Sequence, residues 1–353
     1  MIDENFLKRY INTPSPVGFE FILGGQVVWL NEVKKYTEKT KIDTYGNIYA
    51  YCGDLNANYT VILDAHGDEI SWLVSEITKG GFLKVVKNGG SDLQIAPSTR
   101  VNVWLENGIP ISGVFGHPPI HISERPEKIE IKNLFIDVGA RTYDEVISMG
   151  IEVGNPITPQ DGYMGLGDNF ITGRALDDKL GGYINLMVLK KLKENNINLP
   201  YELIIINSVQ EEIGLKGAAI ASFNINPDVA LIVDVCHAED SPAYKSKQYL
   251  SGDGTILTVA PSVHNKLLRF IKKILSENNI KYKMMSRSGS SGTNTDSYAY
   301  PLGCPSSLFS IPLAYMHTTV ETVHKCDIQS TIDAIYNTLI NLSPEVDLKY
   351  DII

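Results

Sequence analysis

The chain has 353 residues, of which 43% are hydrophobic and 20% are charged, and its net charge is −10. This size and composition are typical of a globular protein with two domains. The negative balance argues against nucleic acid or an anionic membrane as the main partner, since both attract clustered lysine and arginine. No apolar run reaches the length of a membrane span. The N-terminal segment is acidic where a signal peptide is basic and apolar, so we expect a cytoplasmic protein.

The four cysteines lie far apart and form no CxxC pair, so we expect reduced and mostly buried thiols. Cys236 directly precedes His237, which raises the possibility of a nucleophile and its base. Neighbours in sequence seldom face each other, and a buried structural cysteine is the commoner case. We therefore do not place a catalytic cysteine here.

The first elements in chain order are a helix and a buried strand. Phe6, Leu7, Tyr10 and Ile11 have helical spacing and predict a helix that packs on the core. The run TVILDAH, at 60–66, is apolar and ends in polar residues, which is typical of a buried strand that emerges at a sheet edge.

The sequence pattern changes between residues 71 and 162, where short segments rich in β-forming residues are separated by Gly, Pro and Asn turns. Asn107-Gly108 predicts a hairpin turn. The segment TYDE, at 142–145, matches a capping box and predicts a brief helix that Gly150 ends. We therefore expect residues 71–162 to form a small β-rich domain inserted into a domain made of residues 1–70 and 163–353.

Strands and helices alternate after the insert. Residues 179–196 and 265–279 read as helices, the first of them amphipathic, and 201–212 and 229–240 read as strands that run into acidic residues. This alternation predicts an α/β fold with a mostly parallel, mixed sheet and helices on both faces.

Acidic and histidine side chains collect where the apolar strands end. They are His66, Asp68, Asp177, Glu211, Glu212, Asp234 and His317. Ligands of open α/β sheets bind outside the carboxyl ends of the strands, so these side chains should converge on one crevice. Each of them alone has an ordinary explanation as a core histidine, a helix cap or a turn residue. All of these explanations holding together is much less probable than one shared site.

A cluster of two histidines and several carboxylates suits Zn²⁺, Co²⁺ or Mn²⁺. The stretch GRALDDKLGG, at 173–182, sets Asp177 beside Asp178 at a helix start. Acids favour the first turn of a helix, but a carboxylate can also bridge two cations, and we expect this role for Asp177. Of the adjacent pair Glu211 and Glu212, one can ligate a metal while the other acts as a general base beside a bound water.

The motifs AHGDE, GRALDDKLGG, QEEIGLKGA, DVCHAED, GTNTDS and IPLAYMHTTVE occur here in the order found in the M42 metallo-aminopeptidases, which the chain resembles over nearly its whole length. The resemblance implies a dinuclear zinc or cobalt exopeptidase, with manganese as a further candidate, that releases N-terminal residues from peptides with a free N-terminus. A metal-bridging water would be the nucleophile.

The resemblance also implies roles for individual residues. His66 and Asp234 would bind one metal. Glu212 and His317 would bind the other, and Asp177 would bridge the two.

Further roles follow for residues around the metals. Glu211 would be the general base, and Asp68 would hold the imidazole of His66, as outer carboxylates commonly do. The Gly- and Ser-rich stretch at 286–297 resembles the family's active-site loop, so we expect it to lie outside the core, with Asp296 as a polar contact for substrate. His237 would lie at the rim of the site, and Gly67 should loosen the turn after His66.

The family implies that the insert drives dimerisation and that dimers assemble into a tetrahedral dodecamer. Two alternative activities stay open: a related co-catalytic metal hydrolase such as a carboxypeptidase or deacylase, and the endoglucanase activity with which some relatives are labelled. A glycosidase needs two carboxylates but no metal, so sensitivity to a chelator separates it from a metallopeptidase.

Overall fold

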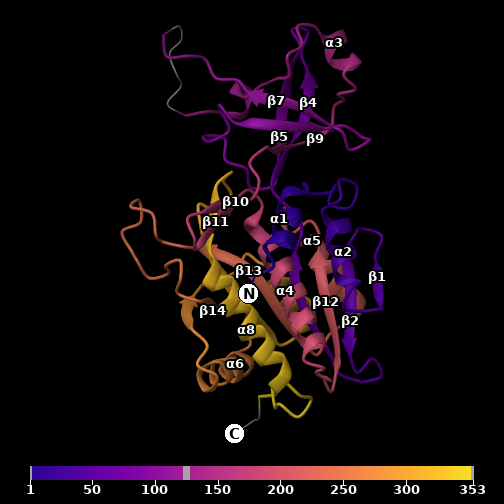
Figure 1. Ribbon diagram of the computed structural model, residues 1–353, viewed down its shortest axis with the longest axis vertical. Helices are drawn as coiled ribbons and strands as arrows, with labels where there is room; N and C mark the ends of the chain where they lie inside the picture. The colour runs from indigo at the N-terminus through magenta and orange to yellow at the C-terminus, as the bar shows by residue number, and fades with distance from the viewer. Residues whose placement is uncertain (1, 122–127, 351–353) are drawn as a thin grey trace.

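The computed structural model describes residues 2–121 and 128–350. Figure 1 shows two units along the long axis: a small barrel at one end, and a larger unit in which helices surround a sheet. The first and last helices, Glu4–Asn12 and Lys325–Asn341, belong to the larger unit, and the strands of the barrel come from the middle of the chain. No helix of the described residues is long and apolar enough to cross a membrane.

The larger unit is organised around a mixed sheet, which has eleven strands within the described residues. These strands are β1 (Thr40–Ile42), β2 (Ile48–Gly53), β3 (Thr60–His66), β10 (Met164–Leu166), β11 (Phe170–Gly173), β12 (Glu202–Ser208), β13 (Val229–His237), β14 (Thr255–Val259), β15 (Tyr282–Ser286), β16 (Ser306–Ala314) and β17 (Glu321–His324). The main path is β1-β2-β12-β3-β13-β16-β17-β11-β10, and β14 pairs with β16 and β15. The neighbours β12, β3, β13 and β16 are parallel, and the flanks of the path are antiparallel. The predicted α/β fold is confirmed.

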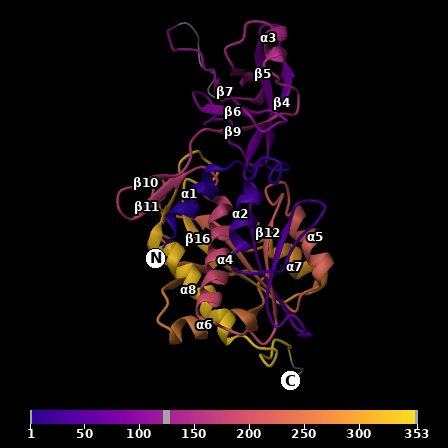
Figure 2. The same ribbon diagram turned by 45° about the vertical axis from the view of Figure 1, so that its right-hand side comes forward.

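Helices cover both faces of this sheet. They are α1 (Glu4–Asn12), α2 (Gly25–Val33), α4 (Leu176–Glu194), α5 (Lys216–Ile225), α6 (Asn265–Glu277), α7 (Thr295–Leu302) and α8 (Lys325–Asn341). In Figure 2, α4 and α8 lie on one side of the sheet and α5 and α7 on the other. The four apolar residues predicted to anchor the first helix are all buried.

Helix α4 differs from the predicted amphipathic helix in its burial. Asp177 and Asp178 have non-helical backbone angles, so the regular turns begin at Lys179, as predicted, but the first fourteen residues of α4 are buried on all sides. The reason is its position, because α4 packs on β3 and β13 and is also covered by α1 and α8. A helix enclosed in this way needs apolar or paired residues on every face.

The barrel is closed in the order β4-β5-β8-β7-β6-β9. Its elements are β4 (Ser71–Ile77), β5 (Phe82–Asn88), β6 (Arg100–Trp104), β7 (Pro110–Phe115), the short 3₁₀ helix η1 (Ile131–Asn133), β8 (Ile136–Asp137), α3 (Tyr143–Ser148) and β9 (Pro156–Pro159). Asn107-Gly108 turns the β6–β7 hairpin, as predicted. The Thr142 hydroxyl accepts a hydrogen bond from the Glu145 amide at 3.2 Å, but the Glu145 side chain accepts from the Arg141 amide rather than from Thr142, so half of the predicted capping box forms. The barrel has an apolar core of its own, separate from that of the larger unit.

Candidate functional site

The predicted site residues meet at the carboxyl ends of the parallel strands. His66 ends β3 and pairs in register with Ser208, the last residue of β12. Asp234 lies on the neighbouring strand β13, and His317 follows β16. This is the edge at which ligands of open α/β sheets bind.

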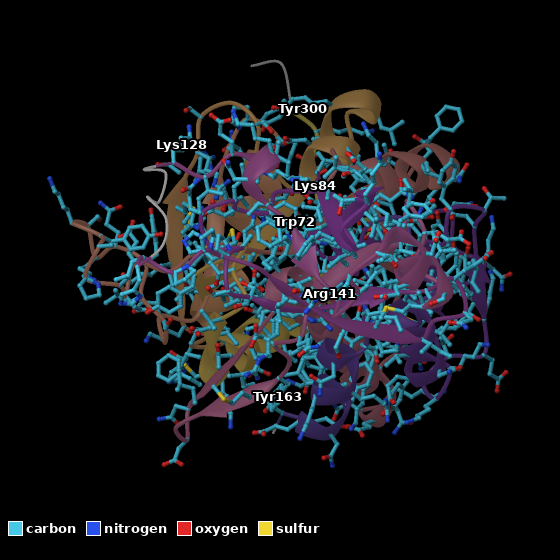
Figure 3. The ribbon with its side chains drawn as sticks, turned by 90° about the horizontal axis from the view of Figure 1, so that it is seen from above. Trp72, Lys84, Lys128, Arg141, Tyr163 and Tyr300 are labelled. Atoms are coloured by element: carbon cyan, nitrogen blue, oxygen red, sulfur yellow. The ribbon has the colours of Figure 1, made fainter. Side chains whose placement is uncertain are left out.

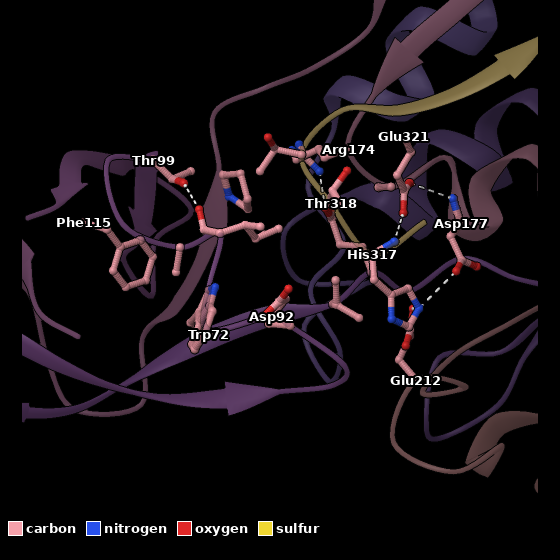
Figure 4. A pocket seen from close by; sticks show the side chains of 18 residues that line it. Trp72, Asp92, Thr99, Phe115, Arg174, Asp177, Glu212, His317, Thr318 and Glu321 are labelled. Atoms are coloured by element: carbon pink, nitrogen blue, oxygen red, sulfur yellow. Dashed lines mark hydrogen bonds and ion pairs between the residues drawn. The ribbon is translucent and has the colours of Figure 1, made fainter. Parts of the chain in front are cut away.

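Asp177 lies between the two histidines. One carboxylate oxygen, Oδ1, is 3.3 Å from Nε2 of His66, and the other, Oδ2, is 3.2 Å from Nε2 of His317. The imidazole of His317 also lies 3.3 Å from Oε1 of Glu212, so that it stands between two carboxylates (Figure 4). One carboxylate therefore presents one oxygen to each histidine.

The donor atoms form two groups that share Asp177. Its first partners are His66 and Asp234, and its second partners are Glu212 and His317; within each group the donor atoms lie within 4.8 Å of one another. These nitrogen and oxygen donors suit a borderline divalent cation.

The charges of these donors also fit bound cations. Among the described residues, no lysine or arginine forms an ion pair with Asp177, Glu212 or Asp234. Burial raises the pKa of Asp234 to about 7, because a buried carboxylate without a cation is costly to ionise. Ions of charge +2 at both groups would remove this cost, so the residues present fit a pair of divalent cations.

Asp68 contacts both His66 and the two adjacent glutamates. Its backbone carbonyl lies 3.2 Å from Nδ1 of His66, and its Oδ1 lies 3.4 Å from the same nitrogen, which faces away from Asp177. Its two carboxylate oxygens also accept hydrogen bonds from the backbone amides of Glu211 and Glu212, at 3.0 and 3.1 Å. Asp68 therefore fixes one imidazole through its carbonyl and carboxylate, and the backbone of the adjacent glutamates through its carboxylate.

Glu211 is buried and lies next to the first donor group. Its Oε2 is 3.9 Å from Nε2 of His66, and burial raises its pKa to about 9. The side chain has no lysine or arginine partner among the described residues. A cation bound nearby would favour the carboxylate form, in which Glu211 can accept a proton.

Glu321 is a site residue that the sequence reasoning missed. Its buried carboxylate accepts hydrogen bonds from the backbone amides of Asp177, at 3.1 Å, and His317, at 2.8 Å. It thus joins the α4 end of the site to the turn that carries His317, whose φ is +61°. The motif MHTTVE contains this acid four residues after the histidine, but the spacing alone does not reveal its partners.

A buried ion-pair cluster next to the site was also missed. Glu69 pairs with Arg174 and lies 3.5 Å from Nζ of Lys179, and its Oε1 accepts a 2.7 Å hydrogen bond from the Ser15 amide. Asp178, one residue before the regular turns of α4 begin at Lys179, accepts a 3.0 Å hydrogen bond from the Gly181 amide, while Asp177 points to the histidines.

The Gly- and Ser-rich loop lies only partly outside the core. Residues 288–290 are exposed, as expected, whereas Ser291, Thr293, Asn294 and Thr295 are buried. The side-chain amide of Asn294 donates to Asp64 on β3 at 3.1 Å. These side chains are small and bond to one another, which allows a polar segment to be buried.

Asp296 lies within the hydrogen bonds of this loop. Its carboxylate accepts from the Ser290 hydroxyl and from the amide and hydroxyl of Ser291. His237 lies at the open end of β13 and lines the cavity beside the site.

Two further expectations concern neighbouring residues. A Cβ placed on Gly67 would lie 2.7 Å from Nδ2 of Asn207, so this glycine is required by close packing rather than for a looser turn. The four cysteines are free, as expected. Burial raises the pKa of Cys236 to about 12, which leaves it a neutral thiol next to the site.

Two cavities border the donor groups. One, with an empty volume of about 580 Å³, lies between the larger unit and the barrel (Figure 4). Its walls include Asp177, Glu212 and His317 on one side and Trp72 and Phe115 of the barrel on the other. Figure 3, seen from the barrel end, labels Trp72 near the centre of the view. The second cavity, of about 960 Å³, borders Glu211.

Comparisons with known proteins identify the family of the chain. Residues 46–333 match the family model described as M42 glutamyl aminopeptidase. A lysyl aminopeptidase of Pyrococcus furiosus is 29% identical over 350 residues, which cover 98% of this chain and 99% of the relative. The TET aminopeptidase of a marine sediment archaeon, Thaumarchaeota archaeon SCGC AB-539-E09, superposes with a TM-score of 0.91 at 25% identity, covering 97% and 98% of the two chains.

A further similar structure is the TET1 peptidase of Pyrococcus horikoshii, which is described as able to assemble into a tetrahedron or a large octahedral shell. Its TM-score is 0.81 at 25% identity, with 96% and 99% of the two chains covered. The fold and these matches define a peptide hydrolase. The chain belongs to the M42 glutamyl aminopeptidase family.

Proposed function

We propose that this protein is a dinuclear metal-dependent aminopeptidase that removes N-terminal residues from peptides. The observation that carries the proposal is the position of Asp177, which presents one oxygen to His66 and the other to His317. The metal ligands would be His66, Asp177, Glu212, Asp234 and His317, and the ions would be Zn²⁺, Co²⁺ or Mn²⁺.

Two divalent cations held there would lower the pKa of a water and polarise the scissile carbonyl. Glu211 would take the proton of this water and then give it to the leaving nitrogen of the peptide. Asp68 would keep Glu211 in place through its hydrogen bond to the Glu211 amide. Glu321 would keep Asp177 and His317 in register through their amides.

We also propose that residues 71–162 form an oligomerisation domain and that residues 1–70 and 163–353 form the catalytic domain. Exposed apolar side chains on the barrel support this role, among them Val86 on β5 and Val114 on β7. An assembly like the shells described for the TET relatives is a dimer-based homo-oligomer, such as a tetrahedral dodecamer. Light scattering on the purified protein measures its mass directly, and a monomer would contradict the proposal.

The activity is tested with aminoacyl-p-nitroanilides, free and N-acetylated, with and without a chelator. We expect hydrolysis to need the free amine, to disappear with chelator and to return with Zn²⁺ or Co²⁺. Cleavage of the acetylated substrates would indicate a deacylase or carboxypeptidase type of site. Hydrolysis at the same rate with and without the chelator would contradict the metal-dependent mechanism.

The base is tested with Glu211→Gln, which keeps the shape of the side chain but cannot accept the proton. We expect kcat to fall by about 10²–10⁴-fold with metal content unchanged. Plasma emission spectrometry measures the metal in wild type and variant. Full activity with full metal content would remove Glu211 from the mechanism.

A further inference from the structure

The cavity that borders Glu211 contains a cationic side chain that the proposed chemistry does not use. Arg287 follows β15 and lines this cavity together with His237, which ends β13. Both side chains share the cavity wall with the candidate metal ligands and with Glu211. A substrate held at the donor groups would therefore extend past them.

Arg287 has no carboxylate partner within residues 2–121 and 128–350. Its Nη1 donates a 2.8 Å hydrogen bond to the backbone carbonyl of Ser291, which ties it to the buried loop that Asp296 organises. A guanidinium has five N–H donors, so most of its hydrogen-bonding capacity stays available to the cavity. Arg287 is thus half-buried, fixed at one end and not neutralised.

His237 adds a second donor without a second charge. Burial and the nearby Arg287 guanidinium lower the pKa of His237, so its imidazole is neutral at pH 7. A neutral imidazole still has one N–H to donate. The combination of a guanidinium and a neutral donor is suited to a carboxylate.

The cavity on the barrel side has no such group. Its arginine, Arg174, is buried and paired with Glu69, so its charge is already compensated. On the barrel side, Asp92 lines the wall of this cavity and would repel an anion. An anionic part of a substrate is therefore favoured on the Arg287 side.

We propose that Arg287, with His237 beside it, forms a subsite that binds a carboxylate of the substrate peptide. The inference rests on the proposed aminopeptidase function. The carboxylate has two possible sources. One is an acidic N-terminal side chain, and the other is the C-terminal carboxylate of a short peptide.

Two pairs of substrates with nearly equal shape separate these sources. Glutamyl- and glutaminyl-p-nitroanilide differ in the charge of the N-terminal side chain. Leucyl-glycine and leucyl-glycinamide differ in the charge at the other end. We expect kcat/KM of wild type to be higher for the charged member of one pair by about tenfold or more, the effect of a charge-assisted hydrogen bond.

The decisive variant is Arg287→Gln, and Arg269→Gln is its control. Arg269 lies on the exposed surface of α6 and has the same charge. Arg287→Gln should remove the preference for the charged substrate and leave leucyl-p-nitroanilide within about threefold of wild type. Arg287→Lys should restore part of the preference, and Arg269→Gln should change neither substrate.

The proposal is overturned by either of two results. One is that wild type shows no preference for the charged member of either pair. The other is that Arg287→Gln lowers kcat/KM equally for all substrates. Hydrolysis of leucyl-p-nitroanilide by wild type tests the aminopeptidase function separately. If no substrate is hydrolysed, that function fails, and the same four compounds are titrated calorimetrically as uncleaved ligands. A Kd that is lower for a charged member, and no longer lower in Arg287→Gln, then still supports the carboxylate subsite.

Discussion

The two donor groups of the candidate site are held in position in different ways. We call the group of His66, Asp177 and Asp234 the His66 half, and the group of Asp177, Glu212 and His317 the His317 half. The His66 side chain is 2% exposed and belongs to β3, at the centre of the sheet, with Asp68 against its second nitrogen. The His317 side chain is 36% exposed and belongs to a turn after β16. Strand pairing fixes the first imidazole, whereas the second depends on the hydrogen bond that Glu321 accepts from its backbone.

The barrel lies next to the His317 half of the site. A Cβ placed on Gly90, in the segment after β5, would lie 2.7 Å from Nδ1 of His317. This segment is anchored to the larger unit, because the Asn88 amide donates to the Val17 carbonyl at 2.9 Å. The insert therefore contacts a candidate metal ligand directly, and the His317 half should be the easier one to disturb.

The largest effect is expected where the two halves share a residue. Asp177→Asn removes the charge that faces both histidines, so both donor groups should lose affinity for a cation, by more than about 100-fold each. Aminopeptidase activity should disappear with the metal. The metal content of the purified variant measures this, with Asp144→Asn on α3 of the barrel as a charge-matched control. Two tightly held ions in Asp177→Asn would contradict a shared ligand.

The next effect separates the halves. His317→Ala should remove one cation and leave the buried His66 group able to bind the other. His66→Ala should remove the cation of the His66 group and leave the His317 group able to bind the other. It should also lower the melting temperature, since it leaves a buried gap next to Asp68. A metal-to-protein ratio near one in both variants would show that each half binds one ion. A lower melting temperature only in His66→Ala would show that the His66 half is the more deeply built into the fold. A ratio near two in either variant would contradict the assigned groups.

The sequence predicts the candidate ligands at the strand ends better than it predicts the residues that hold them in place. His66, Glu212 and Asp234 follow apolar runs, and the edge of a parallel sheet brings such positions together. Glu321 and the Glu69–Arg174 pair were missed because each depends on a partner far along the chain. Glu321 bonds to Asp177 and Glu69 to Arg174, at separations that no local pattern encodes. The buried part of the loop at 286–297 was misplaced for a related reason. Its composition is that of a surface loop, and its burial depends on hydrogen bonds within the loop together with the long-range bond from Asn294 to Asp64.

A smaller effect tests the contact between the barrel and the site. Gly90→Ala should push the imidazole of His317 away from its position, because two of its ring atoms, Nδ1 and Cε1, would lie 2.7 and 2.9 Å from the new methyl group. We expect the affinity for one cation to fall by about 10–100-fold, as for the loss of a residue that orients a ligand. Competition with a graded chelator series measures this in the variant.

The control for Gly90→Ala is Gly165→Ala on β10, where an added Cβ meets no atom within 4 Å. Its affinity for both cations should equal that of wild type. If Gly90→Ala also binds both ions as wild type does, the barrel does not position His317. If it loses both ions equally, the two halves are not independent.

The smallest expected effect on metal binding is for a substitution next to His66, in the half of the site that the β-strands hold. Gly67→Ala puts a methyl group 2.7 Å from Nδ2 of Asn207, a side chain that also bonds to Tyr10 and Gln26 and cannot move freely. Overpacking of this kind costs about 1–3 kcal/mol of the free energy of unfolding. Denaturant unfolding of the chelator-treated protein measures it without a contribution from bound metal. We expect the chelator series to give wild-type affinities for both ions, because the strain falls beneath His66 and strand pairing holds that imidazole. A loss of metal in Gly67→Ala as large as that in Gly90→Ala would mean that the His66 half is no better supported than the His317 half.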